Sequence, residues 1–429
     1  MAFLGMRGTG DWATDERPKG WRQGILRLYP NGAMPLTAIL SKLGSKKVPD
    51  AEFNWWEKML PTQGGAVTGR YTNSGLDSAY VSGGTAGQIV YIKAAEATAE
   101  HFRVGHIAQL RCSTDPTMTV VVRVVGVTLN GASSALACKL LEDDDNGTST
   151  DISDANLIRV TGSAHPEGGG FPDAVAYDPS KRTNYTQIFR TPLMITRTAR
   201  ETSLRTADSY QEAKREALEL HGIEMEKAFM FGIPTENVGE NGKKIRTTGG
   251  CIHFIKTYNA TNGIGNFVTD DNALWNGKTW EQAGHLWLNY RLQLLYKYGS
   301  SDKLALCGAG TIGALNRLAE SLGNINMTPG ETSYGIQVVK WISPHGILNL
   351  KLAPLMSIDD MDDYSMVILE PARLGFRYIT DTTFVKDTGN TGVNRIDGTA
   401  EEFLTEGGLE MSHAMTMGYL TGFGSNNGN

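Results

Sequence analysis

The sequence predicts an α+β protein of more than one domain, and three observations lead to this class. Its 429 residues correspond to two or three domains at the usual size of about 150 residues each. Hydrophobic residues make up 40% of the chain, which is enough for a packed core. Short β-rich runs and periodic helices occur without regular alternation, so we do not expect a doubly wound parallel sheet.

The composition argues against several classes of function. The chain has 40 lysines and arginines against 46 aspartates and glutamates, a net charge of -6, so it lacks an overall positive field that would bind nucleic acid. The four cysteines form no CxxC pair, which argues against a zinc knuckle and a disulfide scaffold and favours a reducing compartment. Neither a signal-peptide core nor a run of 18 apolar residues occurs, so we expect no membrane-spanning segment.

Residues 1 to about 60 predict an extended N-terminal arm. Glycine, proline and aromatic residues are mixed here without a sustained period. Tryptophan side chains need a surface that covers them, and this segment holds four candidates for an interface, Trp12, Trp21, Trp55 and Trp56. These side chains either fold back on the chain's own core or lie on a neighbouring molecule, and the sequence leaves both options open.

A β-rich domain is predicted from about residue 84 to residue 163. Turn-forming residues separate its short runs, which is typical of a small β-barrel or sandwich. The runs are 88–92, 117–127, 134–141 and 156–160. The acidic run 142–145 superficially resembles a calcium loop, but it lacks the ligand spacing and the terminal glutamate of an EF-hand, so we expect a solvated turn.

The remaining elements follow in order along the chain. An extended segment at 185–197 precedes the strongest helix pattern, residues 207–231, where apolar residues recur at steps of mostly three or four. A second unit after residue 250 mixes helices and strands. We expect helices at 280–298 and 311–322, a buried strand at 303–307, a hairpin of 336–342 with 347–353, and another strand pair of 365–369 with 375–379.

Several motifs suggest catalysis but lack the residues that would complete a site. Gly308, Gly310 and Gly313 form a GxGxxG motif between a strand and a helix, but the next strand ends without the acidic residue that would bind a ribose. We therefore expect a tight turn and keep a dinucleotide-binding enzyme as an alternative. Gly277-Lys278-Thr279 lacks the first glycine of a phosphate-binding loop, and the aspartates between 359 and 363 have no nearby histidine. No catalytic, cofactor or metal residue is predicted, and an enzyme is not expected.

Four stretches of the chain carry a resemblance to a known family. They are 184–200 (NYTQIFRTPLMITRTAR), 223–232 (IEMEKAFMFG), 246–255 (RTTGGCIHFI) and 402–423 (EFLTEGGLEMSHAMTMGYLTGF). Together they resemble the major capsid proteins of tailed bacteriophages with the Hong Kong 97-type fold, in the branch with a β-rich insertion. The first two are similar to the strand before the branch's spine helix and to the end of that helix. The third resembles the Gly-Gly segment that follows, and the fourth a terminal strand in which a glycine-rich turn precedes a long β-segment.

The resemblance implies a division of the chain into five parts. Residues 1–60 would be an arm lying over a neighbour, and 61–195 an extended loop that holds the inserted β domain. A peripheral domain with the spine helix would cover 196–245, an axial domain that closes rings would cover 246–380, and a C-terminal strand, 381–429, would return to the peripheral domain. Glycine-rich joints near 64–65, 83–84 and 168–170 would let the arm and loop change direction.

The resemblance also implies a function and partners. The protein would be a major capsid protein whose pentamers and hexamers form an icosahedral head around double-stranded DNA, with a tail tube subunit as a further alternative. Its partners would be its own copies, a separate scaffolding protein, a portal, decoration proteins and DNA bound non-specifically at the inner face, with no membrane. Its location would be the virion, after assembly in the bacterial cytoplasm. The Lys-Asn cross-links of some members cannot be assigned to residues of this sequence.

Overall fold

The computed structural model describes residues 35–42, 44–144, 151–201, 209–321, 328–333, 336–358, 360–386 and 398–427. The chain forms two compact units, residues 56–180 and residues 1–55 together with 181–429. Mixed helices and strands confirm the predicted α+β class. Within the described ranges, no helix has the length and apolar character that crossing a membrane requires.

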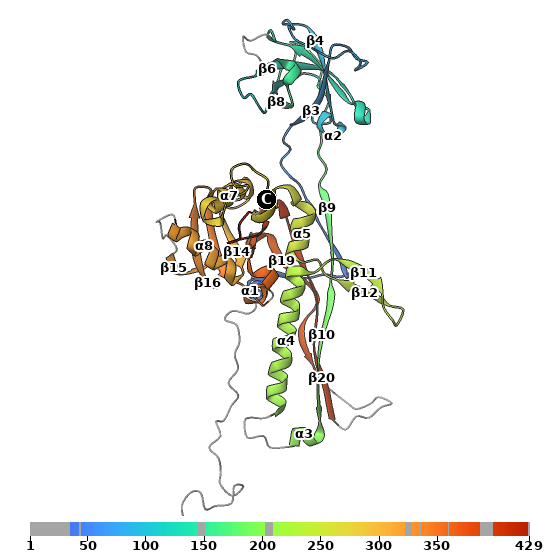
Figure 1. The fold of residues 1–429 in the computed structure, drawn as a ribbon. Helices are drawn as coiled ribbons and strands as arrows, with labels where there is room; N and C mark the ends of the chain where they lie inside the picture. The colour runs from blue at the N-terminus through green and yellow to red at the C-terminus, as the bar shows by residue number, and fades with distance from the viewer. Residues whose placement is uncertain are drawn as a thin grey trace, which may run out of the picture. The chain divides into compact units, whose positions relative to one another are not determined.

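Residues 56–180 are built around a closed six-stranded barrel with its own core, which confirms the barrel option for the β-rich region (Figure 1). Along each strand, side chains alternate between the interior and the surface; in β6, for example, Val120, Val122 and Val124 are buried. A short helix, α2 (Glu96–Ala99), lies between β4 and β5. In barrel order the strands are β3 (Gly64–Tyr71), β4 (Ile89–Ala94), β7 (Ala135–Leu140), β6 (Thr119–Thr128), β5 (His106–Arg111) and β8 (Leu157–Ser163).

The barrel begins earlier than the predicted residue 84, because β3 closes it by pairing with both β4 and β8. Its glycine-rich sequence carries a weak strand signal. A Cβ at Gly64 would lie 2.5 Å from the Ile158 carbonyl oxygen, and one at Gly84 would lie 2.5 Å from the Tyr80 hydroxyl. Gly64 and Gly84 are therefore positions of close packing, whereas Gly83 and Gly168 have φ values of +75° and +70° in open space.

In the described part of the acidic run, residues 142–144, Asp144 is a buried packing element and not part of the solvated turn that the sequence predicts, whereas Glu142 and Asp143 are exposed. Asp144 is buried, accepts a hydrogen bond from the Tyr80 hydroxyl, and accepts another from the backbone N–H of Ile152 at 2.9 Å. Asp143 accepts one from the N–H of Ala86 at 2.7 Å. Burial and these bonds fasten the turn to the barrel, so the carboxylates serve structure.

In the other unit, a four-stranded sheet carries the long predicted helix, α4 (Ser209–Phe231) (Figure 1). The predicted start of this helix, Ala207, lies outside the described residues. α4 packs against the two strands at one side of the sheet, β10 and β20. The sheet order is β1 (Ser45–Lys47), β19 (Leu374–Val385), β20 (Gly398–Met411) and β10 (Gln187–Thr196). Short helices α1 (Pro35–Lys42) and α3 (Arg197–Glu201) contact α4.

The same unit also contains a seven-stranded mixed sheet. Its core contains the ring cluster Phe267, Trp280, Trp287 and Phe423, with Trp280 and Trp287 on helix α7 (Trp280–Leu295). Helix α8 (Ala309–Ser321) also packs here. The strand order is β13 (Ile264–Asn266), β21 (Gly418–Thr421), β18 (Ser365–Leu369), β14 (Asp302–Cys307), β17 (Gly346–Leu352), β16 (Ile336–Ser343) and β15 (Thr328–Ser333).

Smaller elements connect these layers. Two-stranded sheets pair β2 (Glu52–Glu57) with β9 (Ser180–Tyr185), and β11 (Thr235–Val238) with β12 (Lys244–Thr247). Helices α5 (Cys251–Tyr258) and α6 (Ala260–Gly263) follow the hairpin of β11 and β12 in sequence. Helix α9 (Asp360–Asp363) precedes β18.

Two expectations about strands are corrected. The predicted pair at 365–369 and 375–379 does not pair, because β18 lies between β14 and β21 while β19 belongs to the four-stranded sheet. The stretch 402–423 holds two strands in different sheets, and Gly407 and Gly408 lie inside β20 instead of in a turn. A Cβ at Gly408 would lie 2.6 Å from the Tyr185 carbonyl oxygen, so close packing requires this glycine. The hairpin of β16 with β17 is confirmed.

Candidate functional site

Other residues of the chain pack against the GxGxxG turn and fill the space beside it. β14 ends and α8 begins at this turn, as predicted, but a Cβ at Gly308 would lie 2.6 Å from the Cα of Asp363. The Thr311 hydroxyl donates to the carbonyls of Asp363 and Ser365 at 3.1 and 2.9 Å, and Ser357 accepts the Ala309 N–H at 2.8 Å. These contacts fill the space above the helix N-terminus where a pyrophosphate would bind. The glycines permit close packing of the turn.

The other catalytic motifs also have structural roles. Thr279 and Gln282 form a reciprocal capping box at the start of α7, and Lys278 donates to the Leu274 carbonyl at 2.7 Å. Asp362 accepts a hydrogen bond from the Tyr419 hydroxyl at 3.3 Å. Over the described ranges, no three side chains of His, Cys, Asp or Glu come together as metal ligands.

Of the four tryptophans predicted as interface candidates, the two that the structure describes lie in different environments. Trp12 and Trp21 lie outside the described residues. Trp55 is only 8% exposed and packs against Phe53 and Phe254, with ring centroids 6.1 and 5.8 Å away. It therefore belongs to the chain's own core and not to the predicted interface. Trp56, the next residue on β2, points the other way and is 65% exposed. Alternation along a strand separates these two neighbours.

Helix α4 is fixed to the sheet by a buried histidine, which was not among the predicted site residues. His221 contacts two neighbouring strands of the sheet, since Nδ1 lies 2.9 Å from the Thr191 hydroxyl of β10 and Nε2 lies 2.8 Å from the Thr405 hydroxyl of β20. The Thr405 hydroxyl in turn donates to the Thr382 hydroxyl of β19 at 2.9 Å. Burial lowers the pKa of His221, which favours the neutral ring. Its partners lie 30 and 184 residues away in sequence, so no local pattern indicates them.

A second buried group on α4, Glu226, holds helix α1. Its carboxylate accepts hydrogen bonds from the backbone N–H groups of Leu36 and Thr37 at 2.8 and 2.6 Å, and from the Thr37 hydroxyl at 2.5 Å. Burial is the largest influence on this carboxyl and raises its pKa, whereas the three hydrogen bonds act in the opposite direction.

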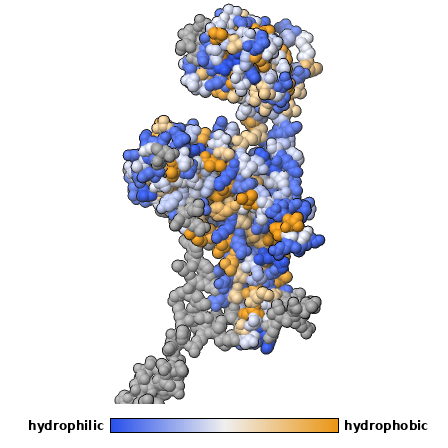
Figure 2. Space-filling view, turned by 45° about the vertical axis from the view of Figure 1, so that its right-hand side comes forward, coloured by the Kyte–Doolittle hydropathy of each residue, from blue (hydrophilic) through white to orange (hydrophobic). Residues whose placement is uncertain are grey.

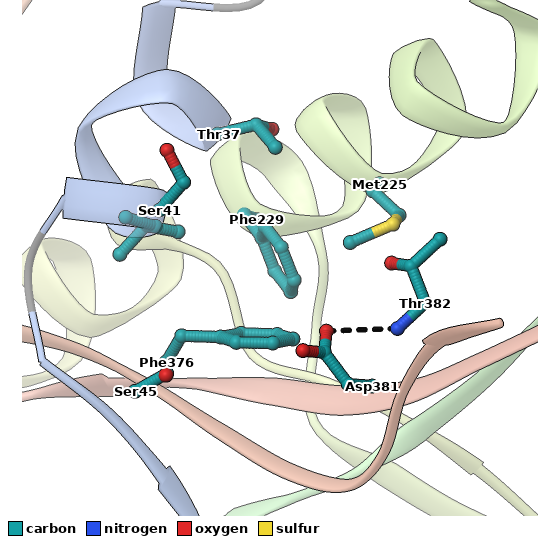
Figure 3. Close-up of a pocket in the computed structure, with 9 residues that line it drawn as sticks. Thr37, Ser41, Ser45, Met225, Phe229, Phe376, Asp381 and Thr382 are labelled. Carbon is teal, nitrogen blue, oxygen red and sulfur yellow. Dashed lines mark hydrogen bonds between the residues drawn. The ribbon is translucent and has the colours of Figure 1, made fainter. Parts of the chain in front are cut away.

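A cavity of about 200 Å³ lies beside this contact, and Figure 3 shows its lining. α1 contributes Thr37, Leu40 and Ser41, and α4 contributes Met225 and Phe229, while Ser45, Phe376, Asp381 and Thr382 complete the lining. The pairing of β19 with β20 shifts register between Thr380 and Thr383, so the strand is irregular where it meets the cavity.

Large apolar side chains are exposed at several places on the unit that holds α4, among hydrophilic ones (Figure 2). One group, Ile233, Val238 and Ile245, lies on the hairpin of β11 and β12 and on the residues before it, and Val238 is 76% exposed. Another, Ile188 and Met194, lies on β10, on the side of the strand opposite to α4. These surfaces can contact other molecules, whereas the buried groups on α4 hold the subunit together.

The chain as a whole matches a known family. A family model described as the SU10 major capsid protein covers residues 19–424 of the 429. The chain belongs to this family. As a phage major capsid protein it is a structural component of the virion, and its family is not a family of enzymes. The alternatives of a dinucleotide-binding enzyme and of a tail tube subunit are therefore overturned.

Other proteins are similar to this chain. The major capsid protein of Pseudomonas phage PaMx41 is 25% identical over 410 residues, which cover 94% of this chain and 85% of the relative. A solved structure from Mycobacterium phage Bobi is 10% identical with a TM-score of 0.45, and the match covers 96% of this chain and 97% of that chain. The capsid of an empty GTA particle is also 10% identical with a TM-score of 0.45, over 95% of this chain and 96% of that chain.

Proposed function

We propose that this capsid protein assembles into pentamers and hexamers of an icosahedral head that encloses a double-stranded DNA genome. The family match over residues 19–424 carries the proposal. The exposed apolar groups on β10 and on the β11–β12 hairpin support it, because neighbouring subunits would cover them. A ring closes through head-to-tail contacts between identical chains, so one subunit needs two different contact surfaces.

We assign the five parts of the Hong Kong 97-type subunit as the sequence analysis does. Residues 1–60 are the arm, 61–195 the extended loop with the inserted barrel, 196–245 the peripheral domain, 246–380 the axial domain and 381–429 the returning strand. The separate core of residues 56–180 supports an inserted domain. The 23 residues of α4, which span about 35 Å, support its assignment as the spine helix. Trp12, Trp21 and Trp56 remain proposed contacts of the arm region with neighbours.

The proposed partners are further copies of the chain, a separate scaffolding protein, a portal, decoration proteins and the packaged DNA. Assembly in the bacterial cytoplasm precedes incorporation into the virion. The DNA contact is non-specific, in accord with a net charge of -6 that provides no strong attraction for phosphates.

The test is to express the protein alone and together with the other structural proteins of its phage. Sedimentation and electron microscopy should then show closed shells, or rings of five and six subunits. A species that stays a 46.6 kDa monomer under all these conditions, or that forms open tubes, would contradict the proposal.

A further inference from the structure

The contact between Glu226 and α1 joins the root of the N-terminal segment to the spine helix. Glu226 is 2% exposed, and its two carboxylate oxygens accept all three hydrogen bonds from the first turn of α1. The N–H groups in the first turn of a helix have no partner within the helix. Glu226 supplies that partner from another helix, and its negative charge lies at the positive end of α1. Pro35, the first helical residue, has no N–H to satisfy.

Glu226 fixes one end of α1, and apolar packing holds the rest. Leu36, Ile39 and Leu40 are buried in the core that α1 shares with α4 and α5. The side of α1 formed by Thr37, Leu40 and Ser41 faces the cavity of about 200 Å³ (Figure 3). The cavity is open to solvent, since Ser41, Asp381 and Thr382 of its lining are exposed, so α1 has room to tilt toward β19. The polar contact at its N-terminal end therefore sets the direction of the helix together with this apolar packing.

We infer that Glu226 is a positioning residue for assembly: it sets the direction in which residues 1–34 join the folded subunit, so its loss reduces shell formation more than it reduces subunit stability. This inference rests on the proposed role of the arm, because only a segment that must reach a neighbour is sensitive to its starting direction. A short α1 that merely fills the core would affect stability and assembly in proportion.

The main variant is Glu226→Gln. A glutamine keeps the size of the side chain but has one acceptor oxygen and one NH₂ donor, so one N–H of Leu36 or Thr37 would face another donor. A milder second variant is Thr37→Val, which removes the hydroxyl but keeps the hydrogen bond from the backbone N–H of residue 37 to Glu226. Thr37→Ser is its matched control, because it keeps all three hydrogen bonds to Glu226. Thr405→Val is the stability control, because it removes a buried partner of α4 on the sheet side, away from α1.

The readouts are hydrogen exchange in residues 36–42, the melting temperature of the subunit, and the yield of shells. Losing a helix cap typically weakens a helix end about five- to tenfold, so Glu226→Gln should exchange faster by that factor in residues 36–42 and form fewer shells. Thr37→Val should show a smaller effect in the same direction, and Thr37→Ser should behave as the unaltered protein. Thr405→Val should lower the melting temperature at least as much as Glu226→Gln, with the exchange of residues 36–42 unchanged.

Three results would overturn the inference: unchanged exchange in residues 36–42 of Glu226→Gln, an unchanged shell yield, or losses of stability and shells in the same proportion as in Thr405→Val. If Glu226→Gln does not fold, the comparison of Thr37→Val with Thr37→Ser decides in the same way. A chain without residues 1–34 separates this inference from the proposed function. If that chain forms shells at full yield, the proposed role of the arm fails, whereas a failure of Glu226→Gln alone to alter assembly leaves the arm's role intact.

Discussion

The three glycines of the GxGxxG motif should respond differently to alanine, because only some of them are in close packing. A Cβ at Gly308 would lie 2.6 Å from the Cα of Asp363, about 1 Å inside the ordinary carbon–carbon contact of about 3.5–4.0 Å. The neighbour is backbone, so the segment around Asp363 must move. That shift also breaks the hydrogen bonds of Thr311 to the carbonyls of Asp363 and Ser365.

The expected cost of Gly308→Ala is about 2–4 kcal/mol, the sum of overpacking and of weakened buried hydrogen bonds. Gly313 is the matched control, because a Cβ there meets nothing within 4 Å and the residue lies inside α8. Gly313→Ala should therefore stabilise the subunit by about 0.5–1 kcal/mol. Gly310→Ala should fall between them, since its Cβ would lie 2.5 Å from the Asp363 carboxylate, a side chain that can move.

Urea unfolding of dissociated subunits, followed by tryptophan fluorescence, measures these changes. Trp280 is a suitable reporter because its indole N–H donates to the Ala314 carbonyl of α8 at 3.0 Å. A Gly308→Ala variant that is as stable as the unaltered subunit would refute the packing argument for this turn. So would a destabilised Gly313→Ala, because open space predicts the opposite sign.

Burial lowers the pKa of His221, so its contribution to stability is present above about pH 6.5, the unfolded value, and is lost as the pH falls through the folded value. His221→Gln should flatten that part of the stability–pH curve, and an unchanged curve would contradict the assignment. Trp55→Ala should lower stability by about 3–5 kcal/mol, whereas Trp56→Ala should stay within about 0.5 kcal/mol, as thermal unfolding can measure. Equal effects would contradict the alternation of β2. Removal of residues 1–34 should leave the melting temperature unchanged, whereas removal of residues 1–50 takes α1 from the core and should yield unfolded protein, which circular dichroism would detect.

Periodicity and turn chemistry sufficed to predict much of the fold. The apolar steps of α4 and α7, the β-rich runs of four barrel strands and the β16–β17 hairpin are local patterns, and the structure confirms them. β3 was missed because its glycines, of which Gly64 fits against the Ile158 carbonyl, give the segment only a weak strand signal. Helix α1 was not predicted because it is short and its apolar residues become part of a core only beside α4.

The polar contacts of α4 could not be predicted for a different reason. Glu226 meets its partners across 189 and 190 residues, and a glutamate in a helix is normally part of the solvated face. Trp55 and Trp56 posed the same difficulty at closer range. Two adjacent tryptophans look alike in the sequence, and only the face of the strand that turns toward the core decides which one is buried.

The pairing of β3 with β8 has a consequence for engineering. Gly64 lies opposite Arg159 and Ala66 lies opposite Leu157, so the first strand of the barrel is paired with the last one, about 5 Å away. β2 and β9, which precede and follow the barrel in sequence, are also paired. A tight loop could bridge either pair with little closure entropy. The barrel is thus a cassette that can be excised, or exchanged for an enzyme or an epitope with adjacent termini, while the strands on both sides keep their register.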